Sequence, residues 1–120
     1  MSNSIQEKRK IYYFGLMAEA VAAFYLRCKF YNIIAKRFKS PFGEIDIIAR
    51  KNKQLIFIEI KARRDTTIMD FISKRQQERI TKAAQYFLLK EAKYQNYEIR
   101  FDAIIMNRYF WPQHFQNYWC

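Results

Sequence analysis

Two apolar runs joined by a short polar turn make up GEIDIIARKNKQLIFIEIKAR, residues 43–63. Both runs are rich in Ile and Phe, so the sequence predicts strands over residues 44–50 and 55–62. Four charged side chains interrupt the two runs: Glu44, Asp46, Glu59 and Lys61. Because burying an unpaired charge is costly, these four residues require an explanation.

Side chains alternate between the two faces of a strand, which segregates these charges. Glu44 and Asp46 share one face of the first strand, and Glu59 and Lys61 share one face of the second. The opposite face is expected to be the packed one, with Ile45, Ile47, Ile56, Ile58 and Ile60. A hairpin turn at residues 52–53 pairs residues whose numbers add to 105. Asp46 is therefore expected to face Glu59, with about 5 Å between their Cβ atoms.

Two carboxylates at this separation repel each other unless their charge is offset. The two acids could share a proton, Lys61 could bridge them, or a hard divalent cation could bind between them. Mg²⁺ takes one or two carboxylates, which would be Asp46 and Glu59, and Lys61 could then activate water or stabilise developing negative charge. A cross-strand salt bridge on a solvated face explains the same residues without catalysis.

The rest of the chain shows helical and strand patterns in turn. Ala-rich helical spacing predicts a helix over residues 13–30, and a strand over residues 31–38 and a turn at residues 40–43 follow. The residues that follow the helical spacing in this segment are Leu16, Ala20, Ala23, Phe24 and Arg27.

The second half of the chain begins with a loop predicted over residues 65–70. Ser73 and Gln76 form a capping box, which predicts a helix from there to about residue 93. The inward stripe expected for this helix is Ile80, Ala83, Ala84, Phe87 and Leu88. A further strand is predicted over residues 98–106, and the aromatic tail after it is expected to cover the sheet, through a short helix after Pro112.

The order helix, three strands, helix, strand predicts an α/β domain with a mixed sheet flanked by helices. Three consecutive strands can form an antiparallel meander, and the second helix can cross over to the last strand. We expect a single domain over residues 13–120, preceded by a basic, mobile extension over residues 1–12.

The chain is strongly basic, with 22 Lys and Arg against 11 Asp and Glu and a net charge of +11 in 120 residues. This excess favours nucleic acid over a membrane as the partner, although a solvated basic surface explains the same charge. No stretch approaches the ~20 apolar residues of a membrane-spanning helix, and MSNSIQEKRK lacks the features of a signal peptide. A cytoplasmic location is therefore expected. His114 is the only histidine, which leaves little material for a zinc or Ser-His-Asp site.

Five segments follow one another along the chain: GLMAEAVAAFYL, FGEIDIIA, LIFIEIKAR, KRQQERITKAAQYFL and IRFDAIIM. In this order and spacing they resemble the YraN family of endonuclease-like proteins, within the PD-(D/E)xK nuclease superfamily, from about residue 15 to about residue 118. The resemblance implies a restriction-endonuclease-like fold, related to Holliday-junction resolvases. It also implies Mg²⁺- or Mn²⁺-dependent hydrolysis of DNA phosphodiester bonds, with branched or structured DNA as substrate and DNA favoured over RNA. Resolvase-like enzymes often act as homodimers.

Carried over by position, the resemblance assigns catalytic roles to four residues. Glu19 matches the acid on the first helix, Asp46 the metal-binding acid, and Glu59 with Lys61 the acid-x-Lys pair. The implied metal ligands are Asp46, Glu59 and Glu19. By helical spacing alone, however, Glu19 fits better with an exposed position facing solvent.

Three further residues match the resemblance with less defined roles. Glu44 belongs to the same GEID motif, and Gln76 aligns where related nucleases carry a polar helix residue near the site. Asp102 shares a strand face with Arg100 and Ile104, which predicts a structural role in a pair with a basic residue.

Basic residues at strand ends and at a helix start are expected to bind phosphates: Lys39, Arg63, Arg64, Lys74 and Arg75. No base-reading helix motif, zinc module or aromatic RNA-binding signature accompanies them, so nonspecific or structure-selective binding is expected. Two alternatives to an active nuclease remain. One is a nucleic-acid-binding module that keeps the fold without catalysis, and the other is an interaction protein whose aromatic tail docks a partner.

Overall fold

The computed structural model describes residues 2–62 and 72–119. Its elements are α1 (Ser2–Cys28), β1 (Asn32–Ser40), β2 (Gly43–Lys51), β3 (Gln54–Ala62), α2 (Lys74–Lys90), the 3-10 helix η1 (Ala92–Tyr94), β4 (Glu98–Met106) and β5 (Pro112–Trp119). The α/β class and the order helix, three strands, helix, strand are confirmed. The loop predicted over residues 65–70 lies outside the described residues.

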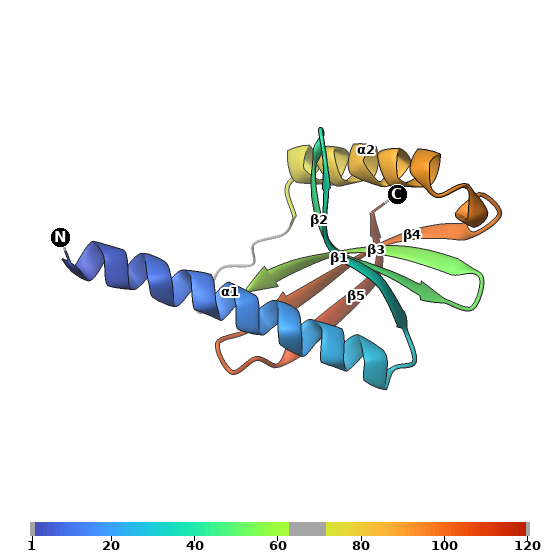
Figure 1. Ribbon diagram of the computed structural model, residues 1–120. Coiled ribbons are helices and arrows are strands. Elements are labelled where there is room, and N and C mark those ends of the chain that lie inside the picture. Colours follow the sequence, from blue (N-terminus) through green and yellow to red (C-terminus); the bar gives the residue numbers. More distant parts are fainter. Residues whose placement is uncertain (1, 63–71, 120) are drawn as a thin grey trace.

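The strands form one five-stranded mixed sheet in the order β1-β2-β3-β4-β5 (Figure 1). β1, β2 and β3 are successive antiparallel neighbours, β4 runs parallel to β3, and β5 is antiparallel to β4. A parallel pair requires a crossover connection, and the segment that contains α2 and η1 makes it. The predicted meander and crossover are therefore confirmed.

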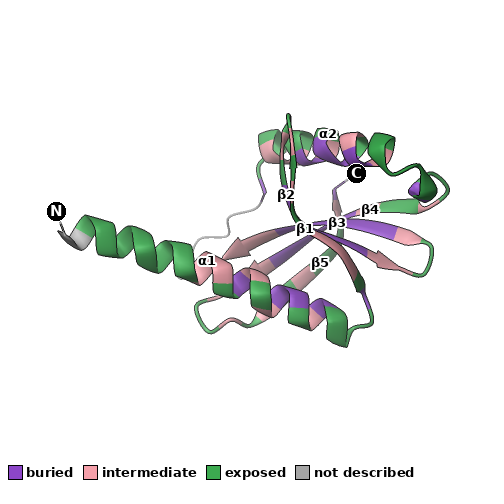
Figure 2. Ribbon diagram, viewed as in Figure 1, coloured by how far each residue is buried: buried purple, intermediate pink, exposed green. Residues whose placement is uncertain are grey.

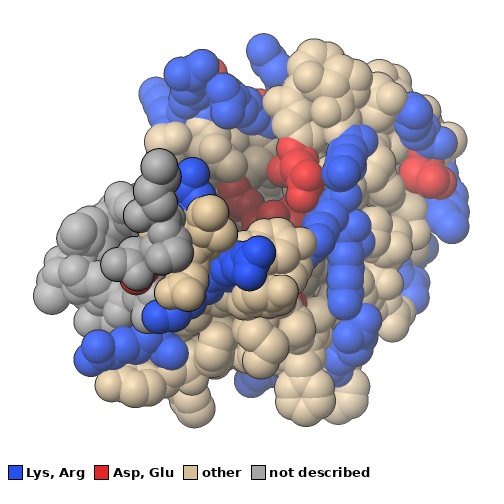
Figure 3. Space-filling model, turned by 60° about the vertical axis from the view of Figure 1, so that its left-hand side comes forward, with Lys and Arg blue, Asp and Glu red and all other residues tan. Residues whose placement is uncertain are grey.

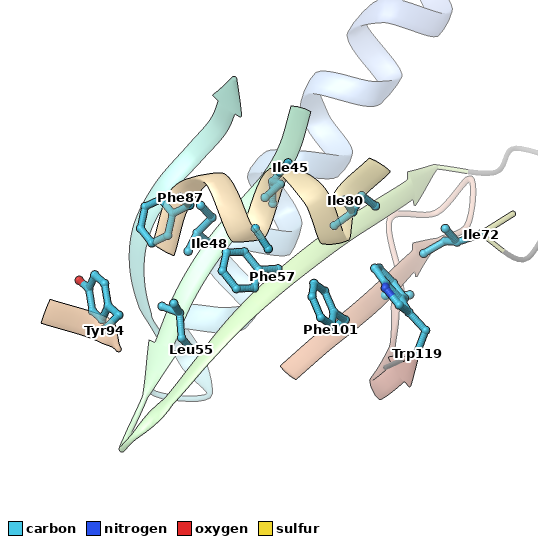
Figure 4. Packing of buried hydrophobic residues seen from close by; sticks show 13 residues of the cluster. Ile45, Ile48, Leu55, Phe57, Ile72, Ile80, Phe87, Tyr94, Phe101 and Trp119 are labelled. Atoms are coloured by element: carbon cyan, nitrogen blue, oxygen red, sulfur yellow. The ribbon is translucent and has the colours of Figure 1, made fainter. Parts of the chain in front are cut away.

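Each face of the sheet packs against one helix. Under α2 lies a cluster that includes Ile48, Phe57 and Phe101, which we call the α2-side cluster (Figure 4). On the other face, Ile47 and Ile58 belong to an α1-side cluster together with α1. The prediction that only one face is packed is wrong, because strands that lie between two layers of helix are buried on both faces.

The β1–β2 hairpin departs from simple alternation near its turn. Ile45 was expected on the same face as Ile47, but it packs in the α2-side cluster. Its partner across the hairpin, Phe38, packs against the same cluster. Arg37, the residue before Phe38, has φ +52°. A left-handed residue interrupts the alternation of side chains, and the end of the hairpin rises toward α2 (Figure 1).

α1 is longer than the sequence predicted, and it faces the sheet differently. It begins at Ser2 rather than near residue 13, and its first half extends beyond the sheet with an exposed surface (Figure 2). Ala20, Phe24 and Arg27 are exposed, whereas the fully buried positions are Ala18, Ala22, Ala23 and Leu26. Of the five residues at helical spacing, Ala23 is buried and Leu16 is half-buried, so the buried face of α1 is not the one that this spacing marks. Neither α1 nor any other described helix is long and apolar enough to cross a membrane.

The aromatic tail forms a strand instead of the short helix predicted after Pro112. β5 pairs with β4, so the tail extends the sheet rather than covering it. Trp119 is buried, and its ring stacks on Phe101 at 5.1 Å between ring centroids. The inward stripe predicted for α2 is correct, because Ile80, Ala83, Ala84 and Phe87 are buried and Leu88 packs against them. Removing residues 110–120 would therefore remove a sheet strand and part of the core.

Candidate functional site

The β2–β3 hairpin brings Asp46 and Glu59 together. Its paired residues add to 105 as predicted, and the last pair of the ladder is Ile47 with Ile58. At the next position, the Ile60 N–H donates to Asp46 Oδ2 at 2.8 Å. Where the β2–β3 ladder ends, the Asp46 carboxylate thus accepts a hydrogen bond from a backbone N–H of β3.

The Asp46 and Glu59 carboxyl groups lie close enough to share a hydrogen bond, which can form only when one of the two groups is protonated. Burial of Asp46, followed by its hydrogen bond to Glu59 and the charge of Glu59, raises the pKa of Asp46 to about 8. The Ile60 N–H and the positive charge of Lys61 oppose this rise in pKa. Of the three ways to offset the repulsion between the two acids, a shared proton is the one that the raised pKa of Asp46 favours.

Glu59 is also held from α2. Its side chain is buried, and Gln76 Nε2 donates to Glu59 Oε2 at 2.6 Å. Ser73 caps α2 as predicted, since its Oγ accepts the Gln76 N–H at 3.1 Å. In a complete capping box the Gln76 side chain would return to the N-cap backbone, but here it contacts Glu59 instead. Gln76, to which the sequence assigned no defined role, thus lies in direct contact with Glu59 of the acid pair.

Lys61 follows Glu59 by two positions on β3 and is half-buried. Its positive charge lowers the pKa of Asp46, which places the ammonium within electrostatic reach of the acid pair. It makes no ion pair with any of the described residues. Lys61 therefore contributes charge to the site without bridging the two carboxylates.

Glu19 is not part of the acid pair. Its carboxylate pairs with Arg37, at 2.9 Å from Arg37 Nε to Oε1 and 3.5 Å from Nη2 to Oε2. α1 covers the face of the sheet opposite the one on which Gln76 of α2 meets Glu59. In residues 2–62 and 72–119, no three Asp, Glu, His or Cys side chains form a group that could hold a metal ion. The structure thus brings together Asp46 and Glu59 of the expected ligand set, but not Glu19.

Glu19 and Arg37 instead line a hollow with Lys39 and Glu44, between α1 and the β1–β2 hairpin. Lys39 and Glu44 are direct partners across the two strands. The hydrogen bond and charge of Glu19 raise the pKa of Arg37, and Glu44 adds a smaller effect. Figure 3 shows acidic side chains within a hollow of the surface, with Lys and Arg side chains beside it. Glu44, which had no defined role in the sequence, therefore belongs to this charged hollow.

The residues expected to bind phosphates lie on the surface where they are described. Lys39 is exposed on β1, and Lys74 and Arg75 are exposed in the first turn of α2, next to Gln76. Arg63 and Arg64 lie outside the described residues.

Asp102 is a second buried acid, on the α1 side of the sheet. It accepts from Arg100 Nε at 2.9 Å and Nη2 at 2.8 Å, from His114 Nε2 at 2.7 Å and from the Asn117 N–H at 2.9 Å. Burial acts to raise the pKa of Asp102, but the donors from His114, Arg100 and Asn117 hold it below its usual value. The predicted pairing of Asp102 with a basic residue is confirmed. His114 was not anticipated as a partner, because it lies on the strand that the sequence did not predict.

The family model described as "Uncharacterised protein family UPF0102" matches residues 18–106. A UPF0102 protein of Nitrobacter winogradskyi is 44% identical over 101 residues, which cover 83% of this chain and 86% of that protein. One from Ehrlichia ruminantium is 42% identical over 108 residues, covering 88% and 82% of the two chains. One from a Bradyrhizobium strain is 46% identical over 101 residues, covering 83% and 74%. The chain therefore belongs to the UPF0102 family.

Proposed function

We propose that this protein is a metal-dependent endonuclease that hydrolyses phosphodiester bonds in DNA, with branched or structured DNA as its substrate. The observation that carries the proposal is the contact between the half-buried carboxyl group of Asp46 and the buried carboxyl group of Glu59, with Lys61 two positions beyond. Two acids kept against each other at the end of a hairpin ladder reduce stability, and such costs are characteristic of functional sites. The resemblance of the acid, acid-x-Lys set to the PD-(D/E)xK nucleases supports the same chemistry.

The acid pair suits a hard divalent cation such as Mg²⁺ or Mn²⁺. These ions prefer carboxylate oxygens, and Asp46 and Glu59 offer two carboxyl groups in contact. A cation bound by both groups would offset the repulsion that the shared proton now offsets. When bound, it would supply positive charge beside the scissile phosphate and make water more acidic.

Other residues of the chain orient these acids. The Ile60 N–H fixes Asp46 Oδ2, and Gln76 Nε2 fixes Glu59 Oε2. Each carboxyl group is therefore held by one donor from a regular element, as required of ligands that must keep a defined geometry. Lys61 supplies a positive charge that would favour a phosphate group or a deprotonated water near Asp46.

The surface charge fits a polyanionic substrate. The net charge is +11, and Lys39, Lys74 and Arg75 are exposed. Contacts of Lys and Arg with phosphates supply affinity that does not depend on sequence, which agrees with a substrate selected by its shape.

The test is cleavage of labelled four-way-junction and linear duplex DNA with Mg²⁺ or Mn²⁺. Wild type should cut in the presence of either ion and not in EDTA. Asp46→Asn and Lys61→Ala should each reduce the rate by about 100-fold or more. Two exposed residues provide matched controls, since Glu98→Gln and Lys82→Ala should cut like wild type. The proposal fails if wild type cuts nothing, or if Asp46→Asn and Lys61→Ala cut as fast as wild type.

A nucleic-acid-binding module without catalysis is the second candidate. The pairing of Glu19 with Arg37 favours it, because an acid that the nuclease resemblance assigns to the metal is already neutralised by a cation. This candidate predicts DNA binding that weakens steeply with salt but does not respond to divalent cations or to Glu59→Gln. Binding that depends on Mn²⁺ would exclude it.

A further inference from the structure

A groove distinct from the charged hollow of Glu19 lies between α1 and the turn that joins β4 to β5. Its helix side is lined by Arg9, Lys10, Tyr13 and Phe14, together with Met17, and its volume is about 870 Å³. Its other side is formed by residues 108–110. Cations and aromatic rings thus line the groove, and no acidic residue is among its lining residues.

The turn at residues 107–111 is held in a defined shape. Asn107 Oδ1 accepts the N–H groups of Tyr109 at 2.8 Å and Trp111 at 3.1 Å, and the Asn107 carbonyl accepts the Phe110 N–H at 3.0 Å. Phe110 adopts φ +59°, and its ring contacts Phe14 of α1 at 5.0 Å between centroids. The turn is therefore locked against the helix before any ligand binds.

This locked turn exposes large aromatic side chains. Tyr109 is 74% exposed and Trp111 is 70% exposed. The Arg108 guanidinium lies 5.1 Å from the centre of the Tyr109 ring. Exposed rings beside cations, carried on a backbone that is already ordered, suit flat, negatively charged ligands.

α1 separates this groove from the charged hollow of Glu19. The groove is lined by helix positions such as Lys10 and Phe14, and the hollow by Tyr12 and Leu16. Positions two residues apart are rotated by about 200° around a helix, so the two depressions lie on opposite sides of α1. A ligand in the groove would lie about one helix diameter, ~10 Å, from the hollow.

We propose that the groove between α1 and the 107–111 turn binds a single-stranded segment of nucleic acid. Within the groove a base stacks on Tyr109, while Arg9, Lys10 and Arg108 pair with phosphates. Trp111, which is exposed on the same turn but does not line the groove, offers a ring for a further base. The inference rests on the proposed function and sharpens it, because it requires a substrate that carries an unpaired strand.

Charge and shape favour this occupant over others. A second copy bound groove to groove would bring the same cations of both copies together, which is unfavourable. An anionic membrane would also attract Arg, Lys and aromatic rings, but an interfacial helix inserts a convex apolar face into the bilayer. Here the surface is a groove between α1 and the 108–110 segment, with Arg and Lys side chains among the residues that line it.

The test is fluorescence anisotropy with a labelled oligo(dT) and a length-matched duplex, in EDTA so that no cleavage contributes. Wild type should bind oligo(dT), and Tyr109→Ala and Trp111→Ala should each weaken this binding about tenfold, as expected for the loss of one stacked base. Phe24→Ala is the matched control, since it removes an exposed ring from α1 outside the groove, and it should bind like wild type. Arg108→Gln should weaken binding and reduce its salt dependence.

Several results would overturn the inference. They are unchanged oligo(dT) binding by both aromatic variants, equal losses in Phe24→Ala, or binding to phosphatidylserine vesicles without binding to oligo(dT). A change of oligomeric state in Tyr109→Ala and Trp111→Ala, with oligo(dT) binding intact, would assign the groove to a second copy instead. Asp46→Asn separates this inference from the nuclease proposal, because it should abolish cleavage and leave oligo(dT) binding unchanged.

Discussion

Two acidic sites lie on opposite faces of the same sheet, and they differ in the partners of the carboxyl group and in the direction of its pKa shift. Asp102 receives donors from a guanidinium, an imidazole and a backbone N–H, so its pKa is lowered and its charge is kept. Asp46 meets a second acid, Glu59, and its pKa is raised to about 8. The Asp102 site is complete within the fold. In the Asp46–Glu59 site, no described cation forms an ion pair with either carboxyl group, and Lys61 acts on it only through its charge, which is why we assign function to this site and structure to the other.

The largest expected effect is the loss of stability in Asp102→Asn. The substitution removes a fully buried charge and leaves Arg100 without its carboxylate, which costs about 3–5 kcal/mol. Urea denaturation at pH 7 measures the loss. Glu98→Gln on the same strand is exposed and should change stability by less than about 0.5 kcal/mol. If Asp102→Asn is as stable as wild type, the contrast between the two sites is wrong.

Asp46→Asn, in contrast, should raise the free energy of unfolding at neutral and alkaline pH. Because the pKa of Asp46 is raised to about 8 in the folded state, the folded protein holds a proton that the unfolded chain releases above about pH 4. The free energy of unfolding of wild type should therefore fall as the pH rises from about 4 to about 8, by at most about 1.4 kcal/mol per pH unit. An Asn side chain does not titrate, and its amide can donate to Glu59 as the protonated carboxyl group does.

The measurement is the difference in unfolding free energy between Asp46→Asn and wild type at several pH values. The stability of the variant relative to wild type should increase as the pH rises. A difference in unfolding free energy that does not change with pH would contradict the proposal that Asp46 and Glu59 share a proton. Asp102 should show the opposite pH dependence. Because its pKa is lowered in the folded state, its charged form contributes to stability above the usual pKa of Asp, and this stability is lost as the pH falls below that value.

A divalent cation should stabilise the Asp46–Glu59 site and leave the Asp102 site unaffected. At a free Mn²⁺ concentration ten times its Kd, the stabilisation should be about 1.4 kcal/mol. The thermal unfolding midpoint with and without Mn²⁺ at pH 8 measures it. Wild type should shift upward and Asp46→Asn should not. An equal shift in both proteins would place the bound ion elsewhere.

The smallest effect is expected at the Glu19–Arg37 pair, which is partly exposed on both sides. Glu19→Gln should lower the unfolding midpoint only slightly in dilute buffer, and the difference should vanish in about 0.5 M NaCl because salt screens exposed charges. Arg37→Gln should behave in the same way, and the double variant should equal either single one. A large loss that persists in salt would make this pair a structural site comparable with Asp102.

Local rules predicted the acid pair correctly but failed for α1. The two-residue turn was sufficient to predict the register as far as Ile47 and Ile58, the pair directly before Asp46 and Glu59, because a turn depends only on neighbouring residues. α2 carries a distinct apolar stripe, and its inward face was predicted correctly. In α1 the Ala residues at positions 18, 20, 22 and 23 suit several helix faces equally, so periodicity could not select the buried one.

The sequence by itself determined the α/β order, the β2–β3 register, the Ser73 cap and the candidate acids, because each follows from local preference and side-chain alternation. Tertiary structure alone decided that β5 joins the sheet and brings His114 to Asp102. It also decided that Gln76 reaches Glu59, and that Arg37 turns out of the strand pattern and pairs with Glu19. These contacts join segments far apart in the chain, and their energies depend on burial and charge that exist only once the helices have packed on the sheet.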